Sequence, residues 1–342
     1  MSGRAQSLAG TATTPSADPA PHLMSCMEVW GGNHSVDQGV VMPGLELWIH
    51  SEPHQGHSQG GDVHYVSSCG TGRISRMVLA DVSGHGESAG DMARTLRRLM
   101  RQFVNFVDQT RFVRAMNASL HDDPSGNFAT SVAMTFFAPS HRLDLCNAGH
   151  PRPFLFRARQ RAWSVLSAEP PSPGRESSAP SNLPLGVLAP TEYAEFGLRL
   201  EPGDLVLAYT DALIETRRPD GAMLNEAGLL EMVRSLDASQ PERIVPALVA
   251  TLADLRRGEP PDDDLTVLLL RHTSRAERAG FLDRLMASLR FLGMLVRHAI
   301  PIGERPPIPW PEISRVNILG AFSRRVAESW DGPASKGRPP PS

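Results

Sequence analysis

Lysine is almost missing from this 342-residue chain. Of its 34 basic residues only Lys336 is a lysine, and it lies in a Pro/Ser-rich terminus where no ordered pocket is expected. Schiff-base catalysis, pyridoxal-phosphate attachment, the Walker A phosphate site and the kinase strand lysine all need a lysine held in a folded core. The sequence therefore excludes these chemistries.

Cysteines and long apolar runs are also scarce. Cys26, Cys69 and Cys146 are too few and too scattered for a thiolate zinc site or a disulfide framework, and they fit a reducing compartment. The N-terminus shows no signal-peptide core, and no run of about 18 uncharged apolar residues occurs. We therefore expect a soluble, cytoplasmic protein.

The charge is small overall but unevenly distributed. With 34 basic and 37 acidic residues the net charge is −3, which argues against nucleic acid or an anionic membrane as a general electrostatic partner. Residues 1–270 carry 22 basic and 31 acidic side chains, whereas residues 271–342 carry 12 and 6. An acidic body thus precedes a basic tail.

The length is sufficient for two domains, or for one large domain with appendages. Composition divides the chain into segments, because stretches rich in Pro, Ser, Gly and Ala cannot bury enough apolar surface to fold. The predicted segments are a disordered N-terminus at 1–25, an N-terminal extension at 26–43, a main folded domain at 44–272 with a Pro/Ser-rich loop at 167–182, a basic helical C-terminal extension at 273–330 with a Pro-rich linker at 301–311, and a disordered tail at 331–342.

Hydrophobic periodicity predicts both strands and helices. Runs rich in β-branched or aromatic residues predict strands at 45–50, 74–80, 130–137, 142–147, 154–156, 205–209 and 265–270. A helix is expected soon after Gly86, where Met92, Leu96, Leu99, Phe103 and Val107 form one apolar stripe, and others at 111–121, 227–236 and 241–255. Because strands come in adjacent runs, an α+β fold with mostly antiparallel sheets is expected.

Aspartates recur at the ends of the predicted strands. They are Asp62, Asp81, Asp211 and the run Asp262-Asp263-Asp264. An aspartate after a strand is often only a turn former. Several together, without lysines and with few arginines nearby, need another source of positive charge, because an unpaired buried carboxylate is costly. Oxygen ligands of this kind suit Mg²⁺ or Mn²⁺, so the sequence predicts a divalent-metal site.

Four histidines, His50, His54, His57 and His64, crowd the approach to Asp62. Their spacing matches neither H-E-x-x-H nor a zinc-finger pattern. A polar, mobile loop beside the site is favoured over a zinc centre.

Several short motifs occur in a specific order. They are Gly60-Gly61-Asp62, Ala80-Asp81-Val82-Ser83-Gly84-His85-Gly86, Phe128-Ala129-Thr130-Ser131, Asn147-Ala148-Gly149-His150-Pro151, Pro184-Leu185-Gly186-Val187, Gly203-Asp204-Leu205 running to Thr210-Asp211-Ala212-Leu213-Ile214-Glu215, and Asp263-Asp264-Leu265-Thr266. Over residues 44–272 the chain resembles the SpoIIE-type branch of the metal-dependent protein serine/threonine phosphatases, which are protein phosphatase 2C-like. The resemblance implies a sandwich of two antiparallel β-sheets flanked by helices, with two Mn²⁺ or Mg²⁺ ions at one end.

The resemblance also assigns roles to individual residues. Asp81 matches the carboxylate that bridges the two metals, with the backbone carbonyl of Val82 on the second ion. Asp211 and Asp263 match the other ligands of the first metal, and Asp62 matches an acidic residue that acts through bound water. The adjacent carboxylates of residues 262–264 leave a register choice of one residue open.

Two positions depart from the family pattern. Tyr65 replaces an acidic residue that commonly follows the Gly-Gly-Asp motif, and Ala212 replaces the glycine of the usual Thr-Asp-Gly. Neither change removes a matched ligand. They put metal affinity and rate in question more than the type of reaction.

The resemblance implies hydrolysis of phosphoserine or phosphothreonine on a signalling protein, such as an anti-sigma-factor antagonist. A metal-activated water would attack, in agreement with the lack of a G-x-S-x-G nucleophile motif. His85 and His150 are candidates to protonate the leaving group, although histidines in Gly-rich turns are more often structural. Two alternatives stay open: a non-catalytic binding or regulatory protein with this fold, and a metal-dependent hydrolase of another phosphoester.

The basic tail contains one more amphipathic pattern. Apolar residues from Phe281 to Val296 mark one face of a helix whose other face carries Arg284, Arg290 and Arg297. Packing on the main domain is the favoured interpretation, with docking to a partner or a membrane surface as the alternative. The sequence leaves the oligomeric state open.

Overall fold

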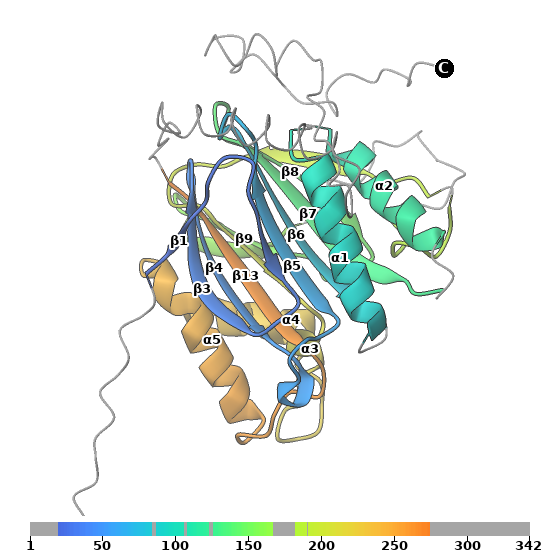
Figure 1. Ribbon diagram of the computed structural model, residues 1–342. Helices are drawn as coiled ribbons and strands as arrows, with labels where there is room; N and C mark the ends of the chain where they lie inside the picture. The colour runs from blue at the N-terminus through green and yellow to red at the C-terminus, as the bar shows by residue number, and fades with distance from the viewer. Residues whose placement is uncertain are drawn as a thin grey trace, which may run out of the picture.

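The computed structural model describes residues 20–83, 87–105, 108–122, 126–166, 182–189 and 191–273. Figure 1 shows two stacked sheets with helices on the outer face of each. The strands are β1 (His22–Leu23), β2 (Val29–Gly32), β3 (Val36–Met42), β4 (Leu45–Glu52), β5 (Asp62–Ser68), β6 (Ile74–Val82), β7 (Ala129–Phe137), β8 (Arg142–Ala148), β9 (Phe154–Arg157), β10 (Ala162–Val165), β11 (Glu195–Arg199), β12 (Leu205–Tyr209) and β13 (Leu265–His272). The helices are η1 (His54–Gly56), α1 (Glu87–Gln102), α2 (Gln109–His121), α3 (Ala212–Glu215), α4 (Asn225–Ser235) and α5 (Pro241–Leu255).

The two sheets are built almost entirely from antiparallel pairs. One has seven strands in the order β1-β3-β4-β13-β12-β9-β10, and the other has six in the order β11-β8-β7-β6-β5-β2. The short β1 pairs with β3 in parallel. Helices α1 and α2 cover the six-stranded sheet, and α4 and α5 cover the seven-stranded sheet. The predicted α+β sandwich of two antiparallel sheets flanked by helices is confirmed.

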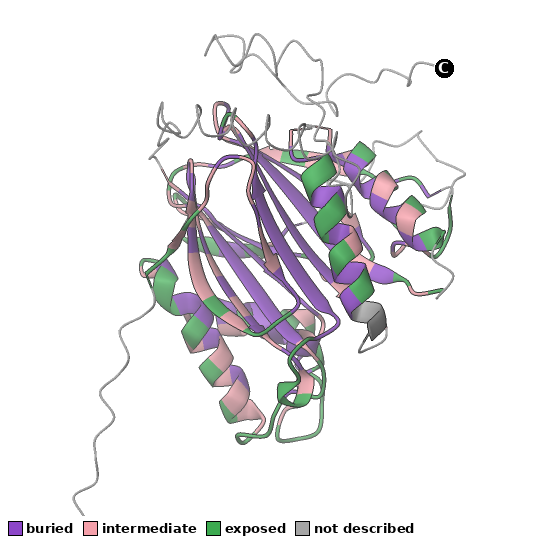
Figure 2. Cartoon of the chain, in the orientation of Figure 1, coloured by how far each residue is buried: buried purple, intermediate pink, exposed green. Residues whose placement is uncertain are grey.

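Alternation along the strands separates three apolar layers, and Figure 2 shows the sheets buried almost throughout. On β6, Met77 and Leu79 join the layer between the sheets, whereas Val78 and Ala80 face α1 and α2. A third layer lies between the seven-stranded sheet and helices α3, α4 and α5. Because side chains alternate, Asp81 lies on the same inter-sheet face as Leu79.

All seven predicted strands and the four predicted helices are present. Met92, Leu96, Leu99 and Phe103 of the predicted stripe are buried against the sheet, and Val107 lies outside the described residues. Asp108 caps α2 by accepting a hydrogen bond from the Arg111 backbone N–H at 3.0 Å.

The sheets also contain strands that the sequence patterns did not predict. Strands β1, β2, β3, β5, β10 and β11 fall in this group, so the sandwich takes in residues ahead of position 44. The predicted tail helix from Phe281 to Val296, and most of the Pro/Ser-rich loop at 167–182, lie outside the described residues. Within the part of the chain that is described, no helix is long and apolar enough to cross a membrane.

Candidate active site

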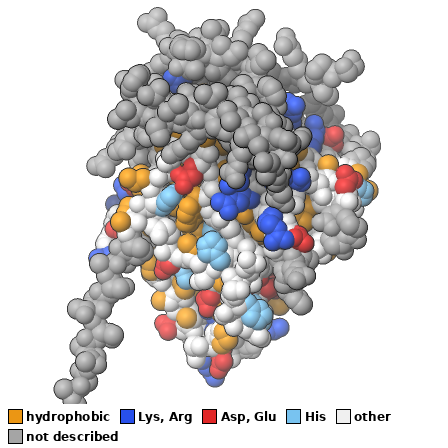
Figure 3. Space-filling model, viewed as in Figure 1, with side chains coloured by type: hydrophobic (Ala, Val, Ile, Leu, Met, Phe, Trp, Pro, Cys, Tyr) orange, Lys and Arg blue, Asp and Glu red, His pale blue; other side chains and the backbone are white. Residues whose placement is uncertain are grey.

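A cavity of about 640 Å³ opens at one end of the sandwich. It lies where β6 ends, where β12 leads into α3, and where the loop before β13 returns to the sheet. Its lining residues are His54, His57, Gln59, Gly60, Gly61, Asp81, Val82, Ser83, Phe128, Thr130, Asp211, Asp263 and Asp264. Histidine and acidic side chains are interspersed on the face drawn in Figure 3, toward the end of the molecule that carries α3.

Sheet register brings the predicted ligands to this cavity from distant parts of the chain. Asp62 and Asp81 are direct partners in the antiparallel β5–β6 ladder. In the seven-stranded sheet, Asp211 comes shortly after the end of β12, and Asp263 comes shortly before the start of the neighbouring strand β13. Four of the five predicted positions, Asp81, Val82, Asp211 and Asp263, therefore line one cavity, with Asp62 buried beside Asp81.

Among the described residues, none of these carboxylates forms an ion pair with an arginine or histidine. Burial, together with the negative charges of Asp211 and Asp263, raises the pKa of Asp81 to about 7. Burial, together with Glu215 and Asp263, also raises the pKa of Asp211. The pKa of Asp62 is raised well above its ordinary value, first by burial and then by Asp81. Bringing such carboxylates together is costly unless a cation joins them.

The donor set fits a hard divalent cation. In the described part of the chain, no group of three or more His, Cys, Asp or Glu side chains is arranged to hold a metal ion as it stands. Mg²⁺ and ions like it usually take only one or two carboxylates and keep several waters, so an open group of oxygens around a cavity suits them. The three cysteines, in contrast, are all buried.

Asp62 is held by a hydroxyl that the sequence analysis did not single out as a site residue. Its Oδ2 accepts a hydrogen bond from Thr210 Oγ1 at 2.7 Å, and Thr210 Oγ1 in turn accepts from the backbone N–H of Thr266 at 2.9 Å. The second bond leaves the hydroxyl proton of Thr210 directed at the carboxylate. The only sequence signal for this role is the position of Thr210 directly before Asp211.

Asp264 has a different task from its neighbour Asp263. Its carboxylate oxygens accept hydrogen bonds from the backbone N–H groups of His54 at 2.6 Å and Gly61 at 2.5 Å. A Cβ at Gly60 would lie 2.5 Å from the same carboxylate, which explains the glycine there. Asp264 thus ties the loop before β5 to the loop before β13, while Asp263 stays exposed on the cavity.

The four histidines near Asp62 do not gather into a site. His50 lies on β4, its Nδ1 3.9 Å from Asp37, and His54 donates its Nδ1–H to the carbonyl of Pro261 at 3.0 Å. His64 is fully buried, and burial lowers its pKa to about 3. His54 and His57 both line the cavity, and His57 is the more exposed of the two.

The two histidines proposed from sequence as proton donors have separate outcomes. His150 is buried behind Thr130, with its Nδ1 2.8 Å from the Thr130 hydroxyl, and burial lowers its pKa to about 3. It is therefore neutral and positions Thr130 on the cavity wall. His85 lies outside the described residues.

Both departures from the family pattern have a structural account. The Tyr65 hydroxyl donates to the backbone carbonyl of Ala93 on α1 at 2.9 Å, so this side chain joins β5 to the helix on the face away from Asp62. Ala212 is buried and begins α3. Neither residue takes up the space of a predicted ligand.

Comparison with known proteins agrees with this geometry. The family model for Stage II sporulation protein E (SpoIIE) matches residues 72–273. The chain is 23% identical over 145 residues to the phosphoserine phosphatase RsbP of Bacillus subtilis, covering 41% of this chain and 33% of that protein. It is 21% identical over 197 residues to the phosphoserine phosphatase RsbU of Bacillus subtilis, covering 57% and 55%. The chain thus spans between a third and about half of these relatives.

Solved structures share the fold. The RsbU and RsbW domains of Rv1364c from Mycobacterium tuberculosis superpose with a TM-score of 0.57 at 22% identity, covering 78% of this chain and 75% of that one. The PP2C phosphatase domain of SpoIIE from Bacillus subtilis, with a fragment of its regulatory domain, gives 0.53 at 17% identity, covering 72% and 64%.

Proposed function

The chain belongs to the SpoIIE family, and from this premise we propose that it is a metal-dependent phosphatase acting on phosphoserine or phosphothreonine of a signalling protein in the cytoplasm. One observation carries the proposal: Asp81, Asp211 and Asp263 converge on one cavity from both sheets, without a lysine to neutralise them. The catalytic unit is the predicted domain at 44–272 together with the strands that precede it.

Each carboxylate has a place in this proposal. Asp81 interacts electrostatically with both Asp211 and Asp263, and we propose it as the bridging ligand. The backbone carbonyl of Val82 would add an oxygen beside it. Asp62, fixed by the hydroxyl of Thr210, would hold the outer water shell from behind Asp81. Two bound Mn²⁺ or Mg²⁺ ions would supply an activated water and neutralise phosphoryl charge.

The surroundings of the carboxylates suit a phosphomonoester. Phosphate-monoester hydrolysis is extremely slow without a catalyst, so the phosphate and the attacking water need strict alignment. Ser83 is held by reciprocal bonds to the backbone of Phe128: its Oγ donates to the carbonyl at 2.8 Å and accepts from the N–H at 3.0 Å. Both residues line the cavity, as does the exposed His57. We propose that His57 donates the proton to the departing serine oxygen.

The substrate is proposed to be a phosphorylated signalling domain of the anti-sigma-factor-antagonist type. Support comes from the relatives named phosphoserine phosphatases and from a structural neighbour that joins an RsbU domain to an RsbW domain.

Hydrolysis of a phosphoserine peptide and of p-nitrophenyl phosphate tests the proposal. We expect turnover with Mn²⁺ and none with EDTA, and a loss of at least about a hundredfold in Asp81→Asn and Asp211→Asn. Asp254→Asn, an exposed carboxylate on α5, is the matched control. Activity that survives EDTA or both substitutions would sink the metal mechanism. A preference for small phosphoesters or nucleotides over every phosphopeptide would favour a different hydrolase.

A further inference from the structure

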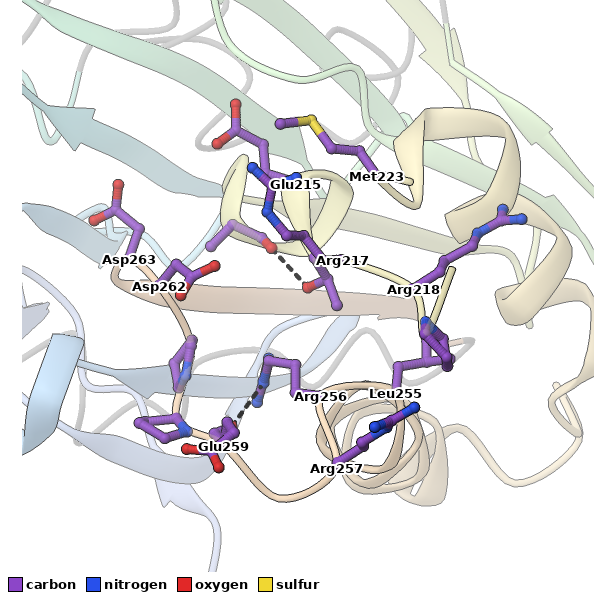
Figure 4. A pocket seen from close by; sticks show the side chains of 15 residues that line it. Glu215, Arg217, Arg218, Met223, Leu255, Arg256, Arg257, Glu259, Asp262 and Asp263 are labelled. Atoms are coloured by element: carbon purple, nitrogen blue, oxygen red, sulfur yellow. Dashed lines mark hydrogen bonds between the residues drawn. The ribbon is translucent and has the colours of Figure 1, made fainter. Parts of the chain in front are cut away.

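A second cavity, of about 450 Å³, lies beside the carboxylate site and shares Asp263 with it. Its walls come from the end of α3, the turn at 216–223, the end of α5 and the loop that leads to β13. Four arginines line it: Arg217, Arg218, Arg256 and Arg257. Figure 4 shows Arg218 and Arg257 on the side away from Asp262 and Asp263, with Arg217 and Arg256 between.

The four arginines have no carboxylate partner within 4.0 Å among the described residues, although Glu215, Glu259 and Asp262 line the same cavity. The side chains of Arg217, Arg218 and Arg256 donate hydrogen bonds to backbone carbonyls. Arg217 donates to Gly221 and Arg218 to Leu224, both at 3.3 Å, and Arg256 donates through Nε to Glu259 at 3.2 Å. Other arginines do pair with acids, as Arg152 with Glu226 and Arg157 with Asp204.

One guanidinium atom is left without any partner. Nη1 of Arg256 is buried and has no hydrogen-bond acceptor among the described residues. A buried donor without an acceptor costs free energy. A guanidinium presents its N–H groups in a planar fork that matches the oxygens of a carboxylate or phosphate. Arg217 and Arg257, on the same cavity, are exposed, so their guanidinium groups are accessible to an anion.

Backbone hydrogen bonds fix the two segments that carry the arginines. Residues 216–224 close on themselves through bonds from the Leu224 N–H to the Thr216 carbonyl at 2.9 Å and from the Arg218 N–H to the Ala222 carbonyl at 2.8 Å. Arg256 and Arg257 sit at the end of α5, where backbone bonds back into the helix hold the chain. Both supports leave little freedom to the backbone, so charged groups on them are preorganised for binding.

We propose that this cavity is a docking subsite for acidic residues that flank the phosphoserine or phosphothreonine of the protein substrate. The inference rests on the proposed function. With the phosphate at the carboxylate site, the neighbouring residues of the substrate reach the arginines past Asp263, which both cavities share. A chain with a single lysine must use arginine for such recognition, and a cavity of this size is typical of ligand sites.

Peptide specificity of the full-length protein tests the subsite. Three phosphoserine peptides are compared: one with Asp and Glu before the phosphoserine, one with them after it, and one with Gln and Asn in their place. We expect one acidic peptide to have a kcat/KM roughly threefold to tenfold above the neutral one, as two exposed ion pairs would give, mainly through KM. This ratio should fall toward one in the Arg217→Gln, Arg257→Gln double variant. Arg243→Gln, at the other end of α5, should keep it.

The salt dependence of the wild-type protein gives a test that needs no variant. The preference should shrink between 50 mM and 500 mM NaCl, because exposed ion pairs are screened. Equal kcat/KM for all three peptides, or a ratio that the double variant keeps, overturns the subsite while leaving the proposed function intact. If the arginines only complement the carbonyl end of α5, the double variant will keep the same peptide preference as the wild type and will have a lower Tm. Absence of metal-dependent hydrolysis of any peptide instead overturns the proposed function.

Discussion

Replacing Asp81 by Asn should stabilise the metal-free protein while abolishing its response to metal. Asp81 lies among other carboxylates, and burial together with this negative field raises its pKa from 3.8 to about 7. A rise of that size corresponds to about 4 kcal/mol of unfavourable free energy once the group is ionised. Asn removes the charge and keeps the shape. We expect a gain of about 2 to 4 kcal/mol at pH 8 in EDTA, or roughly 5 to 15 °C in Tm for a body of this size.

The pH dependence has a definite sign. Because the pKa of Asp81 is raised in the folded state, folding favours its protonated form. The stability that the raised pKa of Asp81 contributes is fully present below pH 3.8 and is lost as the pH rises through about 7. Thermal unfolding in EDTA from pH 5 to 8.5 should therefore show a falling Tm for the wild type and a flatter profile for Asp81→Asn.

Metal should reverse the order of the two proteins. A cation at one hundred times its Kd adds about 2.7 kcal/mol to the stability of the form that binds it, so Mn²⁺ should raise the Tm of the wild type but not that of Asp81→Asn. Asp254→Asn should behave as wild type throughout. An Asp81→Asn protein with an unchanged or lower Tm in EDTA would refute the argument that uncompensated carboxylates destabilise this end of the sandwich.

Three further substitutions test individual contacts. Thr210→Val removes the hydroxyl that donates to Asp62 and should weaken Mn²⁺ binding about tenfold to a hundredfold by calorimetry, whereas Thr210→Ser should retain most of the affinity. Asp264→Ala removes two hydrogen bonds from backbone N–H groups. It should lower the free energy of unfolding, measured in urea, by about 2 to 4 kcal/mol. A smaller loss than that of Asp263→Ala would contradict the role of Asp264 in joining the two loops. His57→Gln should lower kcat for a phosphoserine peptide about a hundredfold and lower it less for p-nitrophenyl phosphate, whose leaving group needs no proton. The exposed His34→Gln is its control, and equal losses on both substrates would exclude proton donation.

The strands that sequence patterns predicted each contain an apolar run. In β6 it is Met77–Ala80 and in β13 it is Val267–Leu270, and these runs are continuous because both faces of the strands are covered. β5 has all seven residues buried as well, yet it includes Asp62, His64 and two serines, so no apolar period marks it. Its polar groups are buried because the site and the neighbouring β2 and β6 enclose them, and this arrangement is decided by tertiary packing.

The candidate site shows the same division. Asp62, Asp81, Asp211 and Asp263 could be proposed from motifs at strand ends, and the sheet register then places them together. The different roles of Asp263 and Asp264 could not be predicted from two adjacent aspartates in the sequence. They depend on which carboxylate meets the N–H groups of a loop some two hundred residues earlier in the chain. The arginine cavity likewise joins two turns that are distant in sequence.

Anomalous diffraction from a crystal grown with Mn²⁺ tests the central claim most directly, namely that these aspartates hold the cations of a hydrolytic site. The account predicts two manganese peaks in the cavity at the end of β6, with Asp81 in contact with both and with Asp211 and Asp263 beside one of them. Peaks at the histidines near η1, or none within reach of Asp81, would contradict it.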